Sequence, residues 1–293
     1  MNSKNMAKHL SRKLKDWVQS IDDPVVAKVV RDNAIVTGGA LVSLLTGEPP
    51  NDYDIYFKTF ESCLVVADYY AKKWNEMYPN KPQVTINHDE DKRITAFIES
   101  VGVVLEDGED GIDDESEPVY TDDDEPDVQE VDDRPKYRPR YFSTNAISLS
   151  DKIQLVIRFY GSVEEIHTNY DFVHCTCSYD FKENKVDLPS RALEAIITKE
   201  LYYMGSKYPL CSIIRSRKFI QRGWFINAGQ YLKMCLQLNE LDLKDLDVFE
   251  DQLAGVDSYY FNQAIKAIKK EQESNPDFTI DNTYLFEIIN RIF

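Results

Sequence analysis

Hydrophobic and polar residues recur with two different periods along the first part of the chain, and these periods predict its elements. Residues 6–31 carry apolar positions at helical spacing, and the Asp-Asp-Pro at 22–24 divides the stretch into two short helices. A short buried strand over 34–37 then runs into a glycine turn, and the following helix is closed by Gly47. Residues 52–57 alternate between polar and apolar side chains, which predicts a strand with one buried and one polar face.

The remaining pattern predicts a mixed sheet followed by helices. The expected elements are a helix over 61–77, strands over 83–87, 94–99, 146–150 and 153–159, a short helix over 162–170 and a strand over 171–181. From Ser190 onward the period is helical, with segments at 191–204, 212–224 and 228–238 and at least two more. We therefore predict an α+β fold with a mixed sheet flanked by helices in residues 1–189, followed by a small α-helical domain in 190–293.

Charge changes this picture in one place only. The formal net charge is −17, yet sixteen acidic residues and no Lys or Arg fall between Glu106 and Asp133. The 51 acidic residues less these sixteen leave 35, against 34 basic residues in the rest of the chain. Such a segment buries no apolar surface, so we predict a disordered acidic insertion over 106–133 that binds a basic partner. The nearly neutral remainder gives no whole-protein case for nucleic-acid binding.

Cysteine content and the length of apolar runs indicate the cellular compartment of the protein. Five cysteines in a chain without a signal-peptide pattern indicate reduced thiols in a cytosol-like compartment. No apolar run approaches the length of a membrane span, so we expect a cytoplasmic protein with no membrane partner.

Two aspartates carry the candidate chemistry. In a strand, residues i and i+2 project to the same face, so Asp52 and Asp54 present their carboxylates side by side. Paired carboxylates repel unless a cation lies between them, and Mg²⁺ takes one or two carboxylates together with phosphate oxygens. Gly38 and Gly39 lack side chains and precede a helix, so phosphates can approach that turn closely. The alternative interpretation is a solvated strand face that follows an ordinary glycine turn.

The string GGALVSLLTGEPPNDYDI at 38–55 resembles, without a gap, the signature of the nucleotidyltransferase superfamily that includes poly(A) polymerases, CCA-adding enzymes and DNA polymerase beta. In the bacterial poly(A) polymerase and CCA-adding branch the stretch runs GGAVRDLLLGRPPxDxDI. The positions in register are Gly38, Gly39, Ala40, Leu44, Leu45, Gly47, Pro49, Pro50, Asp52, Asp54 and Ile55. The resemblance implies that the glycines approach a nucleoside triphosphate and that the aspartates bind catalytic Mg²⁺ or Mn²⁺. Val42 and Ser43 depart from it, because the branch has Arg and Asp there.

The same branch suggests a third carboxylate. It carries an RDFTxNA-like string on a later strand, and Asp171 with Phe172 stands in the matching place, so Asp171 is the candidate third catalytic and metal-binding residue. The alternative role of Asp171 is to cap a turn. The nearby His174, Cys175 and Cys177 suggest zinc, but a strand points His174 away from the cysteines, which favours buried free cysteines.

A basic helix is the last candidate element. The segment 209–224 resembles the PLRxLRxxRFAxRxGF string of that branch, and Arg215, Lys218 and Arg222 fall on one helix face at i, i+3 and i+7. These three residues are candidates for binding nucleotide phosphates, or else form an ordinary solvated face. The EDxxR string with which the branch reads the incoming base is missing, since Lys207, Tyr208 and Cys211 lie in that neighbourhood.

The leading interpretation is therefore a metal-dependent nucleotidyltransferase that moves a nucleoside monophosphate from a triphosphate to an RNA 3′ end or a protein hydroxyl. The competing interpretation is an inactive descendant of the same fold that acts as a binding or structural module. The departures at Val42 and Ser43, the missing EDxxR and the short helical half favour the second. Retention of both aspartates favours the first, because two like charges are costly to keep together without a cation.

Overall fold

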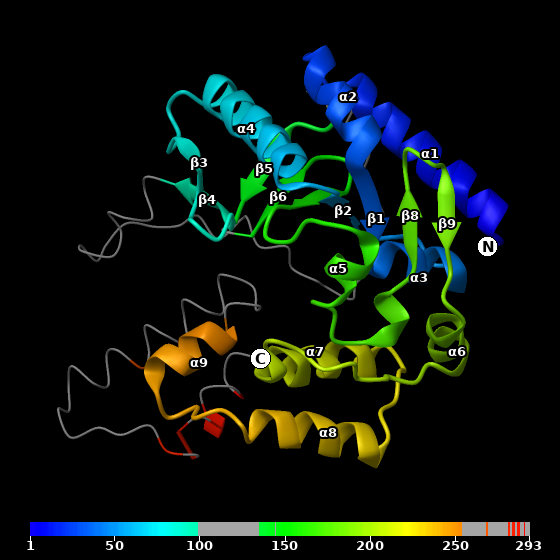
Figure 1. Ribbon diagram of the computed structural model, residues 1–293, viewed down its shortest axis with the longest axis vertical. Helices are drawn as coiled ribbons and strands as arrows, with labels where there is room; N and C mark the ends of the chain where they lie inside the picture. Colours follow the sequence, from blue (N-terminus) through cyan, green and yellow to red (C-terminus); the bar gives the residue numbers. More distant parts are fainter. Residues whose placement is uncertain are drawn as a thin grey trace.

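The computed structural model describes residues 1–98, 135–143 and 145–253, together with scattered positions between 268 and 290. Within this part the chain forms a mixed seven-stranded sheet with helices on its faces, and a group of helices lies below it (Figure 1). The predicted α+β class, with a mixed sheet flanked by helices, is confirmed. The acidic segment 106–133 lies outside the described residues, as does most of the chain after 253.

The central strand of the large sheet carries Asp54, and Asp52 immediately precedes that strand. The strands, in spatial order, are β5 (Pro139–Phe142), β6 (Ala146–Leu149), β7 (Ile153–Val156), β2 (Tyr53–Phe57), β1 (Ala34–Thr37), β8 (Ser178–Asp180) and β9 (Lys185–Asp187). β2 runs parallel to β7 and antiparallel to β1. A separate hairpin of β3 (Val84–His88) and β4 (Ile94–Ile98) packs beside α4 (Phe60–Met77). Because β2 has a neighbour on each side, its register is fixed from both edges.

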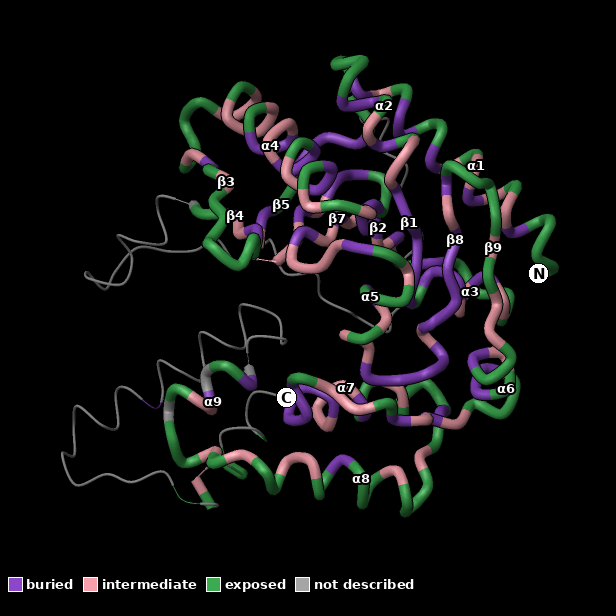
Figure 2. Tube along the Cα trace, in the orientation of Figure 1, coloured by how far each residue is buried: buried purple, intermediate pink, exposed green. Residues whose placement is uncertain are grey.

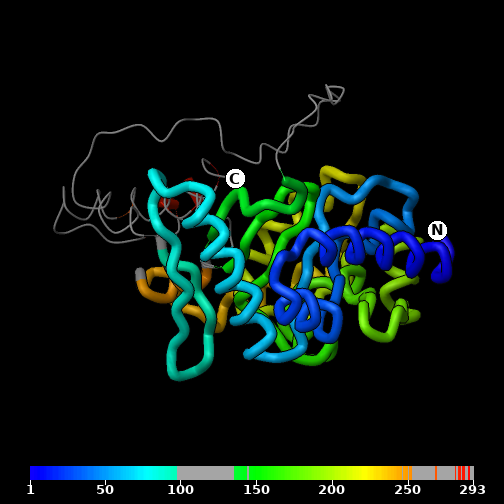
Figure 3. The backbone as a smooth tube through the Cα atoms, turned by 90° about the horizontal axis from the view of Figure 1, so that it is seen from above, coloured from blue at the N-terminus to red at the C-terminus, as the bar shows by residue number. Residues whose placement is uncertain are grey.

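Three helices cover one face of this sheet: α1 (Ser3–Gln19), α2 (Pro24–Asn33) and α4 (Phe60–Met77) (Figure 3). On α1 the positions Met6, Leu10, Leu14 and Trp17 are fully buried, at the spacing of one helix face. Each such side chain stabilises the fold by roughly 1.5–3 kcal/mol. Trp17 also donates its indole N–H to the hydroxyl of Tyr70 on α4 at 2.7 Å, which joins the two helices in the core. Figure 2 shows that β1, in the sheet beneath these helices, is buried along its length.

The predicted helix boundaries are set by local caps. The Asp23 carboxylate accepts the backbone N–H groups of Val25 and Val26, which starts α2 with Pro24 in its first turn. Gly47 adopts φ +89° and closes α3 (Gly39–Thr46), as the sequence predicts. α5 (Val163–His167) begins with a reciprocal bond pair between Ser162 and Glu165.

The predicted strand over 171–181 is wrong for most of its length. Only β8 forms there, and Val173–Cys175 is a 3-10 turn. The segment before β8 pairs with a distant loop instead of the sheet: the Val173 N–H donates to the Tyr202 carbonyl at 3.0 Å, and Phe172 forms a bridge with Tyr203. β5 and β9, which the pattern did not predict, are strands of four and three residues.

The helical part consists of α6 (Ser190–Thr198), α7 (Pro209–Gln221), α8 (Ala228–Leu238) and α9 (Leu246–Leu253). α7 packs against both α8 and α9 and lies beneath the face of the sheet that α5 covers (Figure 1). α6 ends earlier than predicted because Lys199 adopts a left-handed conformation with φ +54°. Within the described residues, every helix is too short or too polar to cross a membrane.

Candidate active site

The two predicted carboxylates lie together on the face of β2 that looks away from the main core. Tyr53, Ile55 and Phe57 pack into that core, while Asp54 projects from the opposite face and Asp52 immediately precedes the strand. Both aspartates are half-buried. The side-by-side placement expected from their spacing is therefore present.

Burial and mutual repulsion act on these carboxylates. Burial raises the pKa of Asp54 to about 8, and the nearby Asp52 charge adds to the rise. Burial also raises the pKa of Asp52, whereas a backbone N–H and the cations Arg222 and Lys152 oppose that rise. Without a cation, the pair therefore disfavours full ionisation near neutral pH. A bound divalent ion relieves that cost, which makes the chemistry of this donor pair fit a metal.

The glycine turn lies directly against Asp54. Gly38 ends β1 with φ +89°, and a Cβ placed on it would lie 3.4 Å from Asp54 Oδ2 and 3.6 Å from the Tyr170 hydroxyl. Its own N–H already donates to the Cys175 carbonyl at 3.2 Å, so Gly38 contributes close approach rather than a donor. A Cβ on Gly39 would meet nothing within 4 Å. The N–H groups of the first turn of α3 are therefore the donors that this turn could offer to an anion.

We expect Gly38→Ala to destabilise the fold by about 1–2 kcal/mol, because an alanine is strained at this positive φ. Gly39→Ala is the matched control, since Gly39 is helical and faces open space, and we expect a change within about 0.5 kcal/mol. Urea unfolding of both variants measures the difference. Equal stability of the two variants would contradict the strained turn.

The hydroxyl groups of Tyr56 and Tyr170 lie near Asp54. Tyr56 follows it on the same face of β2, and burial together with the Asp54 charge raises the pKa of Tyr56, so its hydroxyl keeps its proton. Burial likewise raises the pKa of Tyr170. Thr37 lies 2.8 Å from His167 Nε2 and donates to the Cys177 carbonyl at 2.8 Å. Sequence reasoning missed these residues, although Tyr56 continues the i, i+2 series of Asp52 and Asp54.

Two of the three predicted basic residues reach the site from α7. Arg215 forms an ion pair with Asp171, and its charge also acts on Tyr56. Arg222, just beyond the end of α7, acts electrostatically on Asp52. Lys218 is exposed on the same helix between them. Basic charge from the helical part thus faces the carboxylates of the sheet.

Among the described residues, Asp171 does not form a metal-binding cluster with Asp52 and Asp54. Its side chain is 5% exposed and pairs with Arg215, whose side chain is 41% exposed. On the neighbouring strand β7, the residue in register with Asp54 is Gln154, an amide. No cluster of three or more His, Cys, Asp or Glu side chains suited to a metal occurs among the described residues. The third-ligand role of Asp171 remains a prediction, and an ion held by two carboxylates completes its shell with phosphate oxygens and water.

His174 belongs to the core. It is fully buried, with its ring centroid 4.2 Å from that of Trp224 and 4.6 Å from that of Phe219. Neither ring nitrogen has a hydrogen-bond partner among the described residues. Burial lowers the pKa of His174 to about 3, so the ring is neutral. Cys177 is a buried free thiol, and the argument from strand alternation does not apply because Val173–Cys175 is a turn.

Known proteins resemble this chain in two ways. CCA-adding enzymes resemble it in structure: the Thermotoga maritima enzyme complexed with tRNA(CCA) is 12% identical with a TM-score of 0.40, covering 92% of this chain and 57% of that one. The Bacillus stearothermophilus CCA-adding enzyme in complex with CTP is 13% identical with a TM-score of 0.40, and the match covers 83% of this chain and 49% of that one.

In sequence, the chain is 20% identical over 282 residues to "Gabija anti-defense 2" of Bacillus phage SPbetaL7. The alignment covers 93% of this chain and 56% of that protein, so the chain spans little more than half the length of this relative. The model of the Gabija anti-defense 2 family matches residues 8–199, which is well over half of the chain and includes the glycine turn, both aspartates and Asp171. The chain therefore belongs to the Gabija anti-defense 2 family.

Proposed function

We propose that this protein is a metal-dependent nucleotidyltransferase that moves a nucleoside monophosphate from a nucleoside triphosphate to the hydroxyl of an RNA 3′ end or a protein. The observation that carries the proposal is the contact between the Gly38 turn and the Asp54 carboxylate, with Asp52 beside it. The uninterrupted resemblance of residues 38–55 to the nucleotidyltransferase signature supports it.

The residues of the chain have distinct tasks in this proposal. Asp52 and Asp54 would hold Mg²⁺ or Mn²⁺, and a bound ion would supply positive charge that favours ionisation of the attacking hydroxyl and release of pyrophosphate from the triphosphate. Gly38 and Gly39 leave room for the phosphates beside the first turn of α3. Arg215 and Lys218 on α7 and Arg222 just beyond its end supply positive charge.

The family name points to a biological role for the reaction. The phage relative is called "Gabija anti-defense 2", and we propose that this chain also counteracts Gabija defence. A second candidate is a module of the same fold that blocks its target by binding alone. Val42 and Ser43, at positions where the poly(A) polymerase branch carries charge, favour that candidate.

Calorimetry with the four ribonucleoside triphosphates tests the enzyme proposal. We expect Mg²⁺-dependent binding of at least one triphosphate to the wild type, and its loss in Asp52→Asn/Asp54→Asn, because that variant keeps the side-chain shape and removes the metal-binding charge. The preferred base then directs the search for the acceptor. If none of the four triphosphates binds, the enzyme proposal is contradicted.

Protection of phage in Gabija-bearing cells separates the two candidates. Expressed at equal levels, the wild type is expected to restore phage growth and the double Asn variant is not. Restoration by the double Asn variant as well would assign the effect to binding alone. Failure of both proteins would remove the anti-defence role while leaving the calorimetric result intact.

A further inference from the structure

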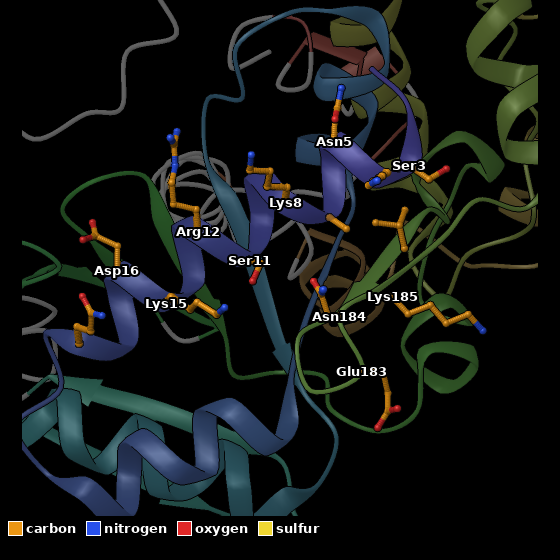
Figure 4. A pocket seen from close by; sticks show the side chains of 14 residues that line it. Ser3, Asn5, Lys8, Ser11, Arg12, Lys15, Asp16, Glu183, Asn184 and Lys185 are labelled. Atoms are coloured by element: carbon orange, nitrogen blue, oxygen red, sulfur yellow. The ribbon is translucent and has the colours of Figure 1, made fainter.

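A groove of about 1350 Å³ runs between α1 and the turn that joins β8 to β9 (Figure 4). None of the residues that line it belongs to the candidate active site. Its walls carry five cations, all on exposed residues: Lys4, Lys8, Arg12 and Lys15 on α1, and Lys185 on β9.

The cations on α1 form a regular row. They recur at i, i+4, i+8 and i+11, and each lies two residues before a member of the buried series Met6, Leu10, Leu14 and Trp17. Two residues correspond to about 200° of helix rotation, so the row lies opposite the buried face. From Lys4 to Lys15 the row extends about 16 Å along the helix axis. That length matches roughly five phosphates of one strand, at about 3.4 Å each.

These cations have no ion partner in the described part of the chain, although acidic groups are nearby. Of the two carboxylates that line the groove, Asp16 accepts the Tyr137 hydroxyl at 2.7 Å and pairs with Lys136 at 3.8 Å. The second carboxylate that lines the groove belongs to Glu183 on the turn between β8 and β9. Outside the acidic segment 106–133 the chain has 35 acidic and 34 basic residues, so counterions for such a row are available in its composition but do not pair with it among the described residues. This positive row without counterions indicates a surface that binds an anion from outside this part of the chain.

We propose that this groove binds the phosphate backbone of a nucleic-acid double helix. The remaining walls offer hydroxyl and amide donors from Ser3, Asn5, Ser11 and Asn184, which are groups that contact phosphates without reading sequence. No aromatic ring is among the residues that line the groove. Sites for single strands combine cations with rings on which bases stack, so the groove fits a duplex better. This inference does not rest on the proposed transfer reaction.

The test is fluorescence anisotropy of the full chain with a labelled duplex of roughly two helical turns, as DNA and as RNA, over a series of salt concentrations. We expect duplex binding whose log affinity falls linearly with log salt. Lys8→Ala/Arg12→Ala should lower the affinity on the order of tenfold per cation at 0.1 M salt and reduce the salt slope by about 2. Lys185→Glu, on the opposite wall, should weaken binding as well.

The matched control is Lys28→Ala/Lys72→Ala, which removes the same charge from exposed lysines of α2 and α4 outside the groove. We expect this control to bind the duplex like the wild type. Absence of duplex binding, equal loss in both double variants, or tighter binding of the single strand would each overturn the proposal. Equally strong displacement of the duplex by a peptide of residues 106–133 would overturn it in favour of an acidic protein ligand. The DNA and RNA arms identify which duplex binds.

Discussion

Asp54→Asn is expected to make the metal-free protein more stable and the proposed enzyme inactive. The pKa of Asp54 rises from 3.8 to about 8 on folding, so the folded state holds a proton that the unfolded chain releases above about pH 4. This carboxyl therefore lowers the stability of the metal-free protein progressively as the pH rises from about 4 to 8. Asparagine removes that penalty, and we expect a gain of roughly 1–4 kcal/mol at neutral pH.

Thermal unfolding in EDTA over pH 4 to 8 measures this effect. The stability of the wild type should fall across the range by more than that of the variant. Mg²⁺ should stabilise the wild type and leave the variant unchanged. Asp91→Asn, on the exposed turn between β3 and β4, is the control and should keep the pH dependence of the wild type. A variant that is no more stable than the wild type in EDTA would contradict the raised pKa of Asp54, which burial and the nearby Asp52 charge cause.

The same substitution should reduce nucleotidyl transfer at least about a thousandfold, because a catalytic metal ion contributes several kcal/mol of transition-state stabilisation. Higher stability together with lost activity is a combination that a purely structural aspartate does not give. Retained transfer in Asp54→Asn would remove this residue from the metal site, whatever its effect on stability.

Asp171→Asn is expected to raise the KM for the triphosphate while leaving the metal requirement unchanged. The structure pairs Asp171 with Arg215, whose charge acts on Tyr56 beside Asp54. Without the Asp171 carboxylate, Arg215 loses the ion pair that the structure gives it beside the site. Loss of this pair should also destabilise the fold by roughly 1–3 kcal/mol, a value reduced from that of a fully buried pair because Arg215 is partly exposed.

Steady-state kinetics with Mn²⁺ and triphosphate varied independently separate the two roles of Asp171. A positioning residue gives a higher KM for the triphosphate, the same Mn²⁺ concentration for half-maximal rate, and a similar phenotype in Arg215→Ala. A third metal ligand instead raises the Mn²⁺ requirement in Asp171→Asn and leaves it normal in Arg215→Ala. The second pattern would show that the ion pair with Arg215 is exchanged for metal coordination when substrate binds.

The local pattern of apolar and polar residues predicted most elements of the α+β part, although not β5 and β9. The burial of Leu10, Leu14 and Trp17 follows from the period of α1, and Asp23 and Gly47 mark helix ends through their own conformations. Pattern failed over 171–181, where apolar and polar residues alternate as in a strand. There the Val173 N–H bonds to the Tyr202 carbonyl, and a partner so far along the chain leaves no trace in local periodicity.

The sequence by itself determined that the chain contains a glycine turn, a helix and two aspartates on one strand face, because the residues involved are neighbours and their geometry follows from backbone periods. Only the tertiary structure decided that Gly38 lies against Asp54, that Arg222 acts on Asp52, and that Asp171 pairs with Arg215. These pairs join segments separated by up to 170 positions along the chain. Their contacts depend on how the sheet and α7 pack together. The residues adjacent to each position in the sequence do not encode that packing.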